Sequence, residues 1–216
     1  MELILLILAS PVIILIIWIK YRAGQKRKAA IAKWLADHHW QTLPDDTIFH
    51  KTWRGFPMSL SLGGGLSREI LCGEVQGWRV SSFLFEYEQN RGGFGDTEIS
   101  KTIHYHVIAV QLPAAMPTLE LTQESRKTRK GRAAKRDIQF ESEDFNRAWH
   151  VESTDRRFAF DVLRPQVMEL LMTPPYRDLP WRIEHEHLIT WHRGKQDLDQ
   201  IHPKALQLIS LARTIP

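Results

Sequence analysis

The chain has 216 residues, a net charge of +4 and one cysteine, Cys72. A single cysteine cannot form an internal disulfide, so the fold does not depend on an oxidising compartment. The positive charge is too small to indicate a nucleic-acid-binding protein, and no nucleic-acid partner is expected. Eight tryptophans and nine phenylalanines supply enough apolar surface for one packed domain after the N-terminal segment.

An apolar run fills residues 3–19, which carry no charged side chain, and Lys20, Tyr21 and Arg22 close it. Roughly 17 residues at about 1.5 Å each make a helix of about 25 Å, slightly shorter than a bilayer core of about 30 Å. A cleaved signal peptide would need a basic start and a small-x-small cleavage site, and the run has neither. A core helix of a soluble protein would show a polar face. The sequence therefore predicts a transmembrane anchor over residues 1–22.

Basic side chains follow the apolar run, at Lys20, Arg22, Lys26, Arg27 and Lys28. The positive-inside rule then predicts a single-pass protein of the cell membrane whose domain lies on the cytoplasmic side. Residues 23–40 are rich in helix formers, and their apolar side chains recur at helical spacing. We expect a basic amphipathic juxtamembrane helix there, with its basic residues facing the anionic lipids of the inner leaflet.

A second basic group lies within residues 126–136, at Arg126, Lys127, Arg129, Lys130, Arg132, Lys135 and Arg136. It contains no aromatic side chain on which bases could stack, so it is a poor platform for single-stranded nucleic acid. Three interpretations stay open: a solvated loop, a contact with anionic lipid, and a contact with a protein or nucleic-acid partner. The second would hold one face of the domain against the membrane.

The remaining residues, 41–216, predict an α+β domain with a mostly antiparallel sheet, for which a barrel-like form is one option. A meander is expected over 70–87 and 97–112 with a turn at Gln76 and Gly77, followed by short strands at 118–122, 137–141 and 145–153. Short helices are expected at 155–163 and 165–172, and a hairpin at 181–191. A last helix over 203–213 would pack on the sheet.

Histidines supply the candidate metal ligands of the chain. His104 and His106, and likewise His185 and His187, are spaced so that two imidazoles share one face of a strand, and His192 could complete a three-histidine site. The sequence around His185 reads as a turn, which would break the shared face. Ordinary exposed or hydrogen-bonded histidines are therefore the favoured interpretation. No cofactor is expected, and no catalytic residue is assigned, because no nucleophile or phosphate-loop motif is present.

Several short segments, at 72–80, 85–87, 110–113, 140–149 and 160–163, resemble a family of uncharacterised actinobacterial-type proteins. Members of this family carry one N-terminal membrane segment and one domain of unknown function. The resemblance covers roughly residues 40–216, and it implies no activity and no catalytic residues. The chain departs from the family pattern at His185 and Glu186, where relatives place a glycine-containing turn.

Together these features favour a non-enzymatic interaction domain tethered to the membrane. A sharper form of this hypothesis makes the chain an accessory subunit of a larger membrane complex, for example a respiratory one, with the helix kinked at Pro11 packed against partner helices. Its partners would be the anionic inner-leaflet lipid and a membrane protein. The competing hypothesis is an enzyme with a histidine-rich or metal-dependent site.

Overall fold

The computed structural model describes residues 2–44, 52–61, 65–91, 99–124 and 136–216, and the side chains of 2–12, 90, 91 and 99 lie outside the description. The chain divides into two compact units, Met1–Gln41 and Thr42–Pro216, which are treated separately. Of the second basic group, predicted at 126–136, residues 126–135 lie outside the described residues and only Arg136 is described.

The first unit is one long helix, α1, which runs from Glu2 to His38 without a break at Gly24. In its C-terminal part Trp34 is buried and Ile31 and Leu35 are partly buried, whereas Ala32, Lys33 and Ala36 are exposed. After the helix ends, the indole of Trp40 packs edge-on against Trp34, with ring centroids 5.1 Å apart. These contacts fix the end of α1.

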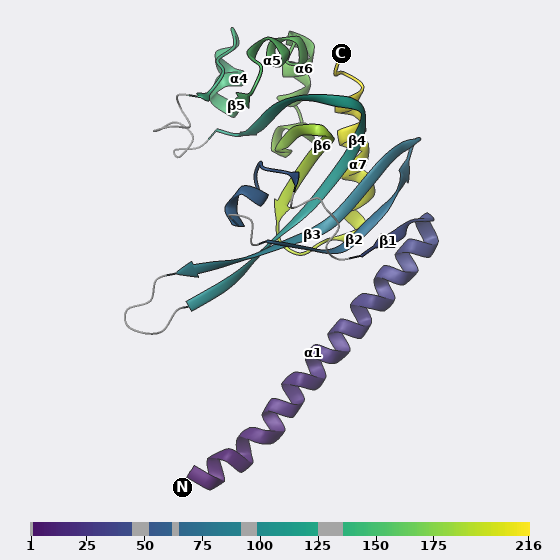
Figure 1. Ribbon diagram of the computed structural model, residues 1–216, viewed down its shortest axis with the longest axis vertical. Coiled ribbons are helices and arrows are strands. Elements are labelled where there is room, and N and C mark those ends of the chain that lie inside the picture. Colours follow the sequence, from purple (N-terminus) through teal and green to yellow (C-terminus); the bar gives the residue numbers. More distant parts are fainter. Residues whose placement is uncertain (1, 45–51, 62–64, 92–98, 125–135) are drawn as a thin grey trace. The chain divides into compact units, whose positions relative to one another are not determined.

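The second unit is built on a six-stranded sheet whose order is β1-β2-β3-β4-β5, with β6 on the other edge of β4. The strands are β1 (Gln41–Leu43), β2 (Leu66–Val75), β3 (Trp78–Arg91), β4 (Ile99–Gln123), β5 (Trp149–Ser153) and β6 (Trp181–Arg193). The ladders β2–β3, β3–β4, β4–β5 and β4–β6 are antiparallel. Figure 1 shows β4 running along the length of the sheet. The α+β prediction is confirmed, but among the described strands the order does not close, so the barrel-like form is wrong.

The central meander β2-β3-β4 is confirmed. Its first turn is made by Gln76 and Gly77, which have φ angles of 51° and 77°, the left-handed pair that a tight hairpin requires. Phe83, Phe85 and Tyr87 alternate onto one buried face, as the sequence predicted. On that face they meet Trp53 and Met58 from the segment before β2, which includes the 3-10 helix η1 (Met58–Ser61).

The opposite face of the sheet is covered by α7 (Leu198–Ala212), which contacts β2, β3, β4 and β6 (Figure 1). This C-terminal helix was predicted to begin at Pro203, but it begins five residues earlier. The carboxylate of Asp197 caps it by accepting the backbone N–H of Asp199 at 3.1 Å, and Pro203 lies inside the helix. The cap therefore determined the start of the helix, and the proline did not.

Two strand predictions were wrong for the same reason. The expected strand at 118–122 belongs to β4, which continues past Pro113 and Pro117 because its register with β6 shifts between Gln111 and Leu119. The expected hairpin at 181–191 is the single strand β6, and His185 takes a φ of 55° at the same irregularity without turning the chain back. An irregular stretch in the β4–β6 pairing, where the extra residues lie on β4, thus replaces two turns.

Short helices gather at the end of the sheet beside β5 (Figure 1): α4 (Glu143–Ala148), α5 (Arg156–Val162), α6 (Pro165–Leu171) and the 3-10 helix η2 (Tyr176–Asp178). The predictions of α5 and α6 are confirmed. The strand expected at 145–153 begins only at Trp149, because Ser142 caps a helical turn by accepting the N–H of Phe145 at 3.3 Å. Residues 137–140 form no strand.

Candidate functional site

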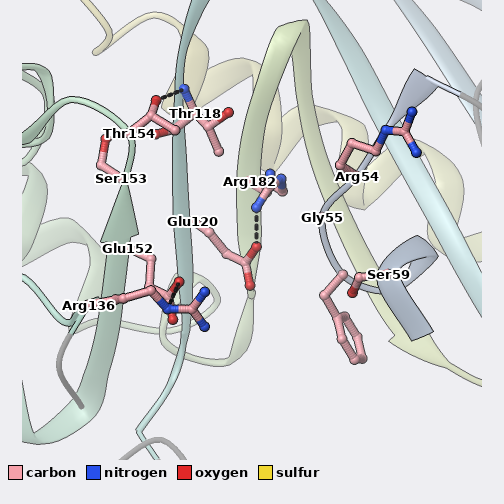
Figure 2. Close-up of a pocket in the computed structure, with 11 residues that line it drawn as sticks. Arg54, Gly55, Ser59, Thr118, Glu120, Arg136, Glu152, Ser153, Thr154 and Arg182 are labelled. Atoms are coloured by element: carbon pink, nitrogen blue, oxygen red, sulfur yellow. Dashed lines mark hydrogen bonds and ion pairs between the residues drawn. The ribbon is translucent and has the colours of Figure 1, made fainter. Parts of the chain in front are cut away.

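A cleft of about 670 Å³ lies where β4, β5 and β6 meet the segment 52–61 (Figure 2). It is lined by Arg54, Gly55, Phe56, Ser59, Thr118, Glu120, Arg136, Glu152, Ser153, Thr154 and Arg182. Strand register brings its charges together, because Glu120 on β4 lies opposite Glu152 on β5 and opposite Arg182 on β6. The cleft is therefore a surface of alternating positive and negative charge.

Arg182 is the central charge of the cleft. Its Nη1 donates to Glu120 and its Nε donates to Glu184 at 3.0 Å. The Arg182 side chain is only 14% exposed, and that of Glu184 is 5% exposed. A charge removed from water to this degree is tolerated only when it is paired and hydrogen-bonded, so the guanidinium must stay between its two carboxylates.

Glu184 also fastens the segment 52–61 to the sheet. Its carboxylate accepts the backbone N–H of Arg54 at 2.5 Å and that of Gly55 at 3.1 Å. A Cβ at Gly55 would lie 2.1 Å from Arg182 Nε, so only glycine allows the backbone to approach the guanidinium this closely. The wall of the cleft and its central arginine are thus held by the same carboxylate.

Burial raises the pKa of Glu120 above its usual value, and the neighbouring carboxylates of Glu152 and Glu184 act in the same direction. The Arg182 guanidinium opposes them. The hydroxyls nearby are engaged with the backbone, since Ser153 Oγ donates to the Thr118 carbonyl at 2.7 Å and Thr154 Oγ1 accepts the Thr118 N–H at 3.1 Å. These groups join β5 to β4, and the geometry is that of a polar binding surface.

Arg136 was predicted, as part of the second basic group, to face lipid. In the structure its Nε lies 3.2 Å from Glu152 Oε2 at the edge of the cleft, and its side chain remains 65% exposed. The other six predicted members, Arg126, Lys127, Arg129, Lys130, Arg132 and Lys135, lie outside the described residues. The ion pair of Arg136 with Glu152 could not be predicted from the sequence, because it depends on the fold of the segment between them.

The five predicted histidines are spread over the sheet. His104 pairs with Glu86 at 3.2 Å, and His106 is fully buried and shares a hydrogen bond of 2.8 Å with Ser82. His192 lies opposite His106 with ring centroids 4.8 Å apart, whereas His187 packs on Trp53 and His185 is exposed. Among the described residues, the group of three or more ligand-type side chains within metal-binding reach contains none of these five.

His192 leads to a prediction about pH. Burial lowers its pKa below the usual 6.5, with Lys204 acting in the same direction and Asp197 against it. The unfolded chain then binds the proton more tightly than the folded one, so the free energy of unfolding should fall as the pH drops below about 6.5. His192→Gln should make this fall shallower in urea titrations between pH 7 and pH 5. An unchanged slope would contradict a role for His192.

The basic residues predicted to face lipid near the N-terminus lie along α1. Lys20, Arg22, Lys26 and Lys28 are exposed and Arg27 is partly buried, and the Arg22 guanidinium lies 4.8 Å from the centre of the Trp18 ring. Within the residues that the structure describes, no helix is both long and apolar enough to cross a membrane. The lipid contacts of these residues stay a prediction.

Cys72 has the surroundings of an unreactive thiol. It is partly buried, and burial raises its pKa, which lowers the fraction of reactive thiolate at neutral pH. Its sulfur lies 3.2 Å from Ser81 Oγ on the neighbouring strand. The side chain therefore acts as a small packing residue at the edge of the sheet.

One comparison with a solved structure bears on the fold of this α+β domain. The crystal structure of the mycobacterial trehalose monomycolate transport factor A, TtfA, is similar, with a TM-score of 0.55 and 14% sequence identity over 86% of this chain and 94% of that one. No protein-family model and no curated protein matches the chain. The similarity is one of fold alone.

Proposed function

We propose that the chain is a non-enzymatic accessory protein, anchored to the cell membrane by the N-terminal part of α1, whose α+β domain binds a partner protein on the cytoplasmic side. The observation that carries this proposal is the apolar surface of α1. Every large apolar residue from 13 to 19 is 47% exposed or more, including Ile13 at 54%, Ile14 at 65% and Ile17 at 61%.

Successive residues of a helix point in all directions around its axis, so this apolar surface surrounds the helix. A surface of this kind is stable only when lipid or another protein covers it. The apolar run begins at residue 3, and because the side chains of 2–12 are outside the description, the first half of the anchor is taken from the sequence alone. The basic residues at 20–28 support a cytoplasmic domain beside an anionic leaflet.

The kind of partner is suggested by the similar fold of TtfA, which is described as a transport factor. The charged cleft supports a binding role, because its arginines and glutamates are paired with one another and its hydroxyls bond the backbone. An accessory subunit of a membrane transport complex, or of another membrane complex such as a respiratory one, fits these features. Lipid contacts of the second basic group at 126–136, expected from the sequence, form part of the same proposal.

The anchor is tested with the full-length chain carrying a C-terminal tag. The wild-type protein should stay with carbonate-washed membranes, and Ile13→Lys/Ile14→Lys should shift more than about tenfold into the supernatant, since each lysine near the centre of a span costs about 2.5–3.5 kcal/mol. The control, Ala29→Lys/Ala30→Lys, adds the same charges to exposed positions of α1 beyond the run and should stay in the membrane. Wild-type protein in the supernatant would overturn the anchor.

The accessory role is tested by purifying the tagged chain in several mild detergents and identifying the attached proteins by mass spectrometry. A defined membrane complex should co-purify, and recovery of the chain alone in every detergent would contradict the role. A C-terminal alkaline phosphatase fusion that is active in cells would place the domain outside and overturn the cytoplasmic orientation.

A further inference from the structure

Three ligand-type side chains converge beside β5, on the other side of Glu152 from the cleft. They are Glu124, just after β4, Asp137, and His150 on β5. His150 Nδ1 lies 3.3 Å from Asp137 Oδ1 and 3.9 Å from Glu124 Oε2, and the ligand atoms of all three lie within 4.8 Å of one another. The three side chains are 10% exposed or less.

Backbone hydrogen bonds hold these side chains in place. The N–H of Glu124 donates to the Ala148 carbonyl at 2.8 Å, which ties the end of β4 to the start of β5. Asp137 is tied to β5 on its own side, because its Oδ1 accepts the N–H of Val151 at 2.9 Å. The convergence is therefore a product of the fold and not of flexible surface side chains.

The imidazole of His150 is oriented for a ligand. Its Nε2 lies 2.9 Å from Glu152 Oε1, and this contact assigns the ring proton to Nε2. Nδ1 then carries a lone pair, and although His150 is only 4% exposed, this nitrogen has no hydrogen-bond partner. A buried lone pair aimed at two carboxylates is repulsive unless a proton or a metal cation lies between them.

Metal-bound histidines commonly have a carboxylate hydrogen-bonded to the ring nitrogen that does not bind the metal, as Glu152 is to His150 Nε2. This contact fixes the tautomer and makes the other nitrogen a stronger ligand. In a tetrahedral site with bonds of about 2.0–2.1 Å, neighbouring ligand atoms are about 3.3 Å apart. The distance of 3.3 Å between His150 Nδ1 and Asp137 Oδ1 matches this edge, whereas Glu124 Oε2, 3.9 Å from the same nitrogen, would need to move closer.

We propose that Glu124, Asp137 and His150 bind one divalent metal ion, with Zn²⁺ preferred. One imidazole and two carboxylates suit zinc better than magnesium or calcium, which favour oxygen ligands alone. A cleft of about 300 Å³ borders Glu124 and Asp137 and is also lined by Gln139 and Asn146. It leaves room for a fourth ligand, such as water.

The proposal is independent of the membrane anchor, since all its residues lie in the second unit. It connects to the candidate site through Glu152, whose Oε1 meets His150 and whose Oε2 meets Arg136. One carboxylate thus supports the metal ligand on one side and the arginine of the charged cleft on the other.

The test uses the full-length chain in mild detergent, stripped with EDTA and titrated with Zn²⁺ alone in a calorimeter. One ion should bind per chain, and Mg²⁺ and Ca²⁺ should bind at least about tenfold more weakly. Asp137→Asn, which keeps an oxygen for the Val151 N–H, and His150→Gln should each weaken Zn²⁺ binding more than about tenfold, and Glu152→Gln by about 10–100-fold. Circular dichroism checks that each variant is folded.

His104→Gln is the matched control, because His104 also lies on the sheet beside a carboxylate but has no third ligand, and it should bind Zn²⁺ as the wild type does. The visible spectrum of the Co²⁺-loaded wild type should show the intense bands of a four-coordinate site, which reports the ligand set even if one variant fails to fold. No stoichiometric Zn²⁺ binding, a six-coordinate Co²⁺ spectrum, or wild-type affinity in the Asp137 and Glu152 variants would each overturn the proposal.

Discussion

Arg182→Met is expected to lower the free energy of unfolding by about 3–5 kcal/mol. Removing one partner of a buried ion pair leaves the other charge uncompensated, and here two carboxylates, Glu120 and Glu184, lose the same cation. Methionine keeps much of the volume, so the loss measures charge more than packing. Urea unfolding of the full-length chain in mild detergent, followed by tryptophan fluorescence, gives the value.

The control for this prediction is Arg136→Met in the same cleft. The ion pair of Arg136 with Glu152 has a similar N to O distance, 3.2 Å, but its side chain is 65% exposed and solvent screens the charge. Its loss should cost about 0–1 kcal/mol. Equal effects of the two substitutions, or a cost below about 1 kcal/mol for Arg182→Met, would show that burial of the Arg182 pair does not stabilise the fold.

Much of the sheet could be predicted because its residues carry a period of two. Phe83, Phe85 and Tyr87 separate from their neighbours by alternation alone, and Gln76 with Gly77 marks the turn. The strand predictions were wrong where a proline in the sequence competes with strand pairing in the fold. Prolines at 113 and 117 usually mark strand ends, but here they lie in the irregular stretch where β4 carries extra residues relative to β6. Such an irregularity depends on the partner strand, which the local sequence does not identify.

The candidate site was largely missed, although part of its signal was in the sequence. Trp181 and Ile183 are buried, so the alternation of β6 places Arg182 and Glu184 together on the other face. What the sequence could not supply is the partner of Arg182, because Glu120 is 62 residues away and reaches it only through the β4–β6 register. Histidine spacing was a poor guide to metal sites for the same reason.

The pair His104 and His106 illustrates this limit. Spacing predicts that both rings share one face of a strand, but burial and partners separate them. His104 is partly exposed beside Glu86, whereas His106 is fully buried under α7 in a hydrogen-bond network that joins three parts of the fold. The network includes Ser82 on β3 and the segment that leads into α7.

Replacing His106 is therefore expected to have the second large effect on stability. His106 Nδ1 accepts the N–H of Asp197 at 3.3 Å, its Nε2 bonds Ser82 Oγ at 2.8 Å, and Gln196 Nε2 donates to the same oxygen at 3.0 Å. His106→Leu leaves the part-buried Asp197 N–H without its acceptor and removes one of two partners of the buried Ser82 oxygen. At about 1–3 kcal/mol each, these losses should lower the free energy of unfolding by about 2–6 kcal/mol.

The matched control is His104→Leu, two residues away on the same strand, which removes only a solvent-screened contact and should cost about 1 kcal/mol or less. The network also predicts where the damage appears, since Asp197 caps α7. In His106→Leu, the rate of amide hydrogen exchange should increase most in the first turn of α7 and less in the strands of the sheet. If the two leucine variants unfold at the same urea concentration, or if exchange in α7 is unchanged, the network does not hold the C-terminal helix on the sheet.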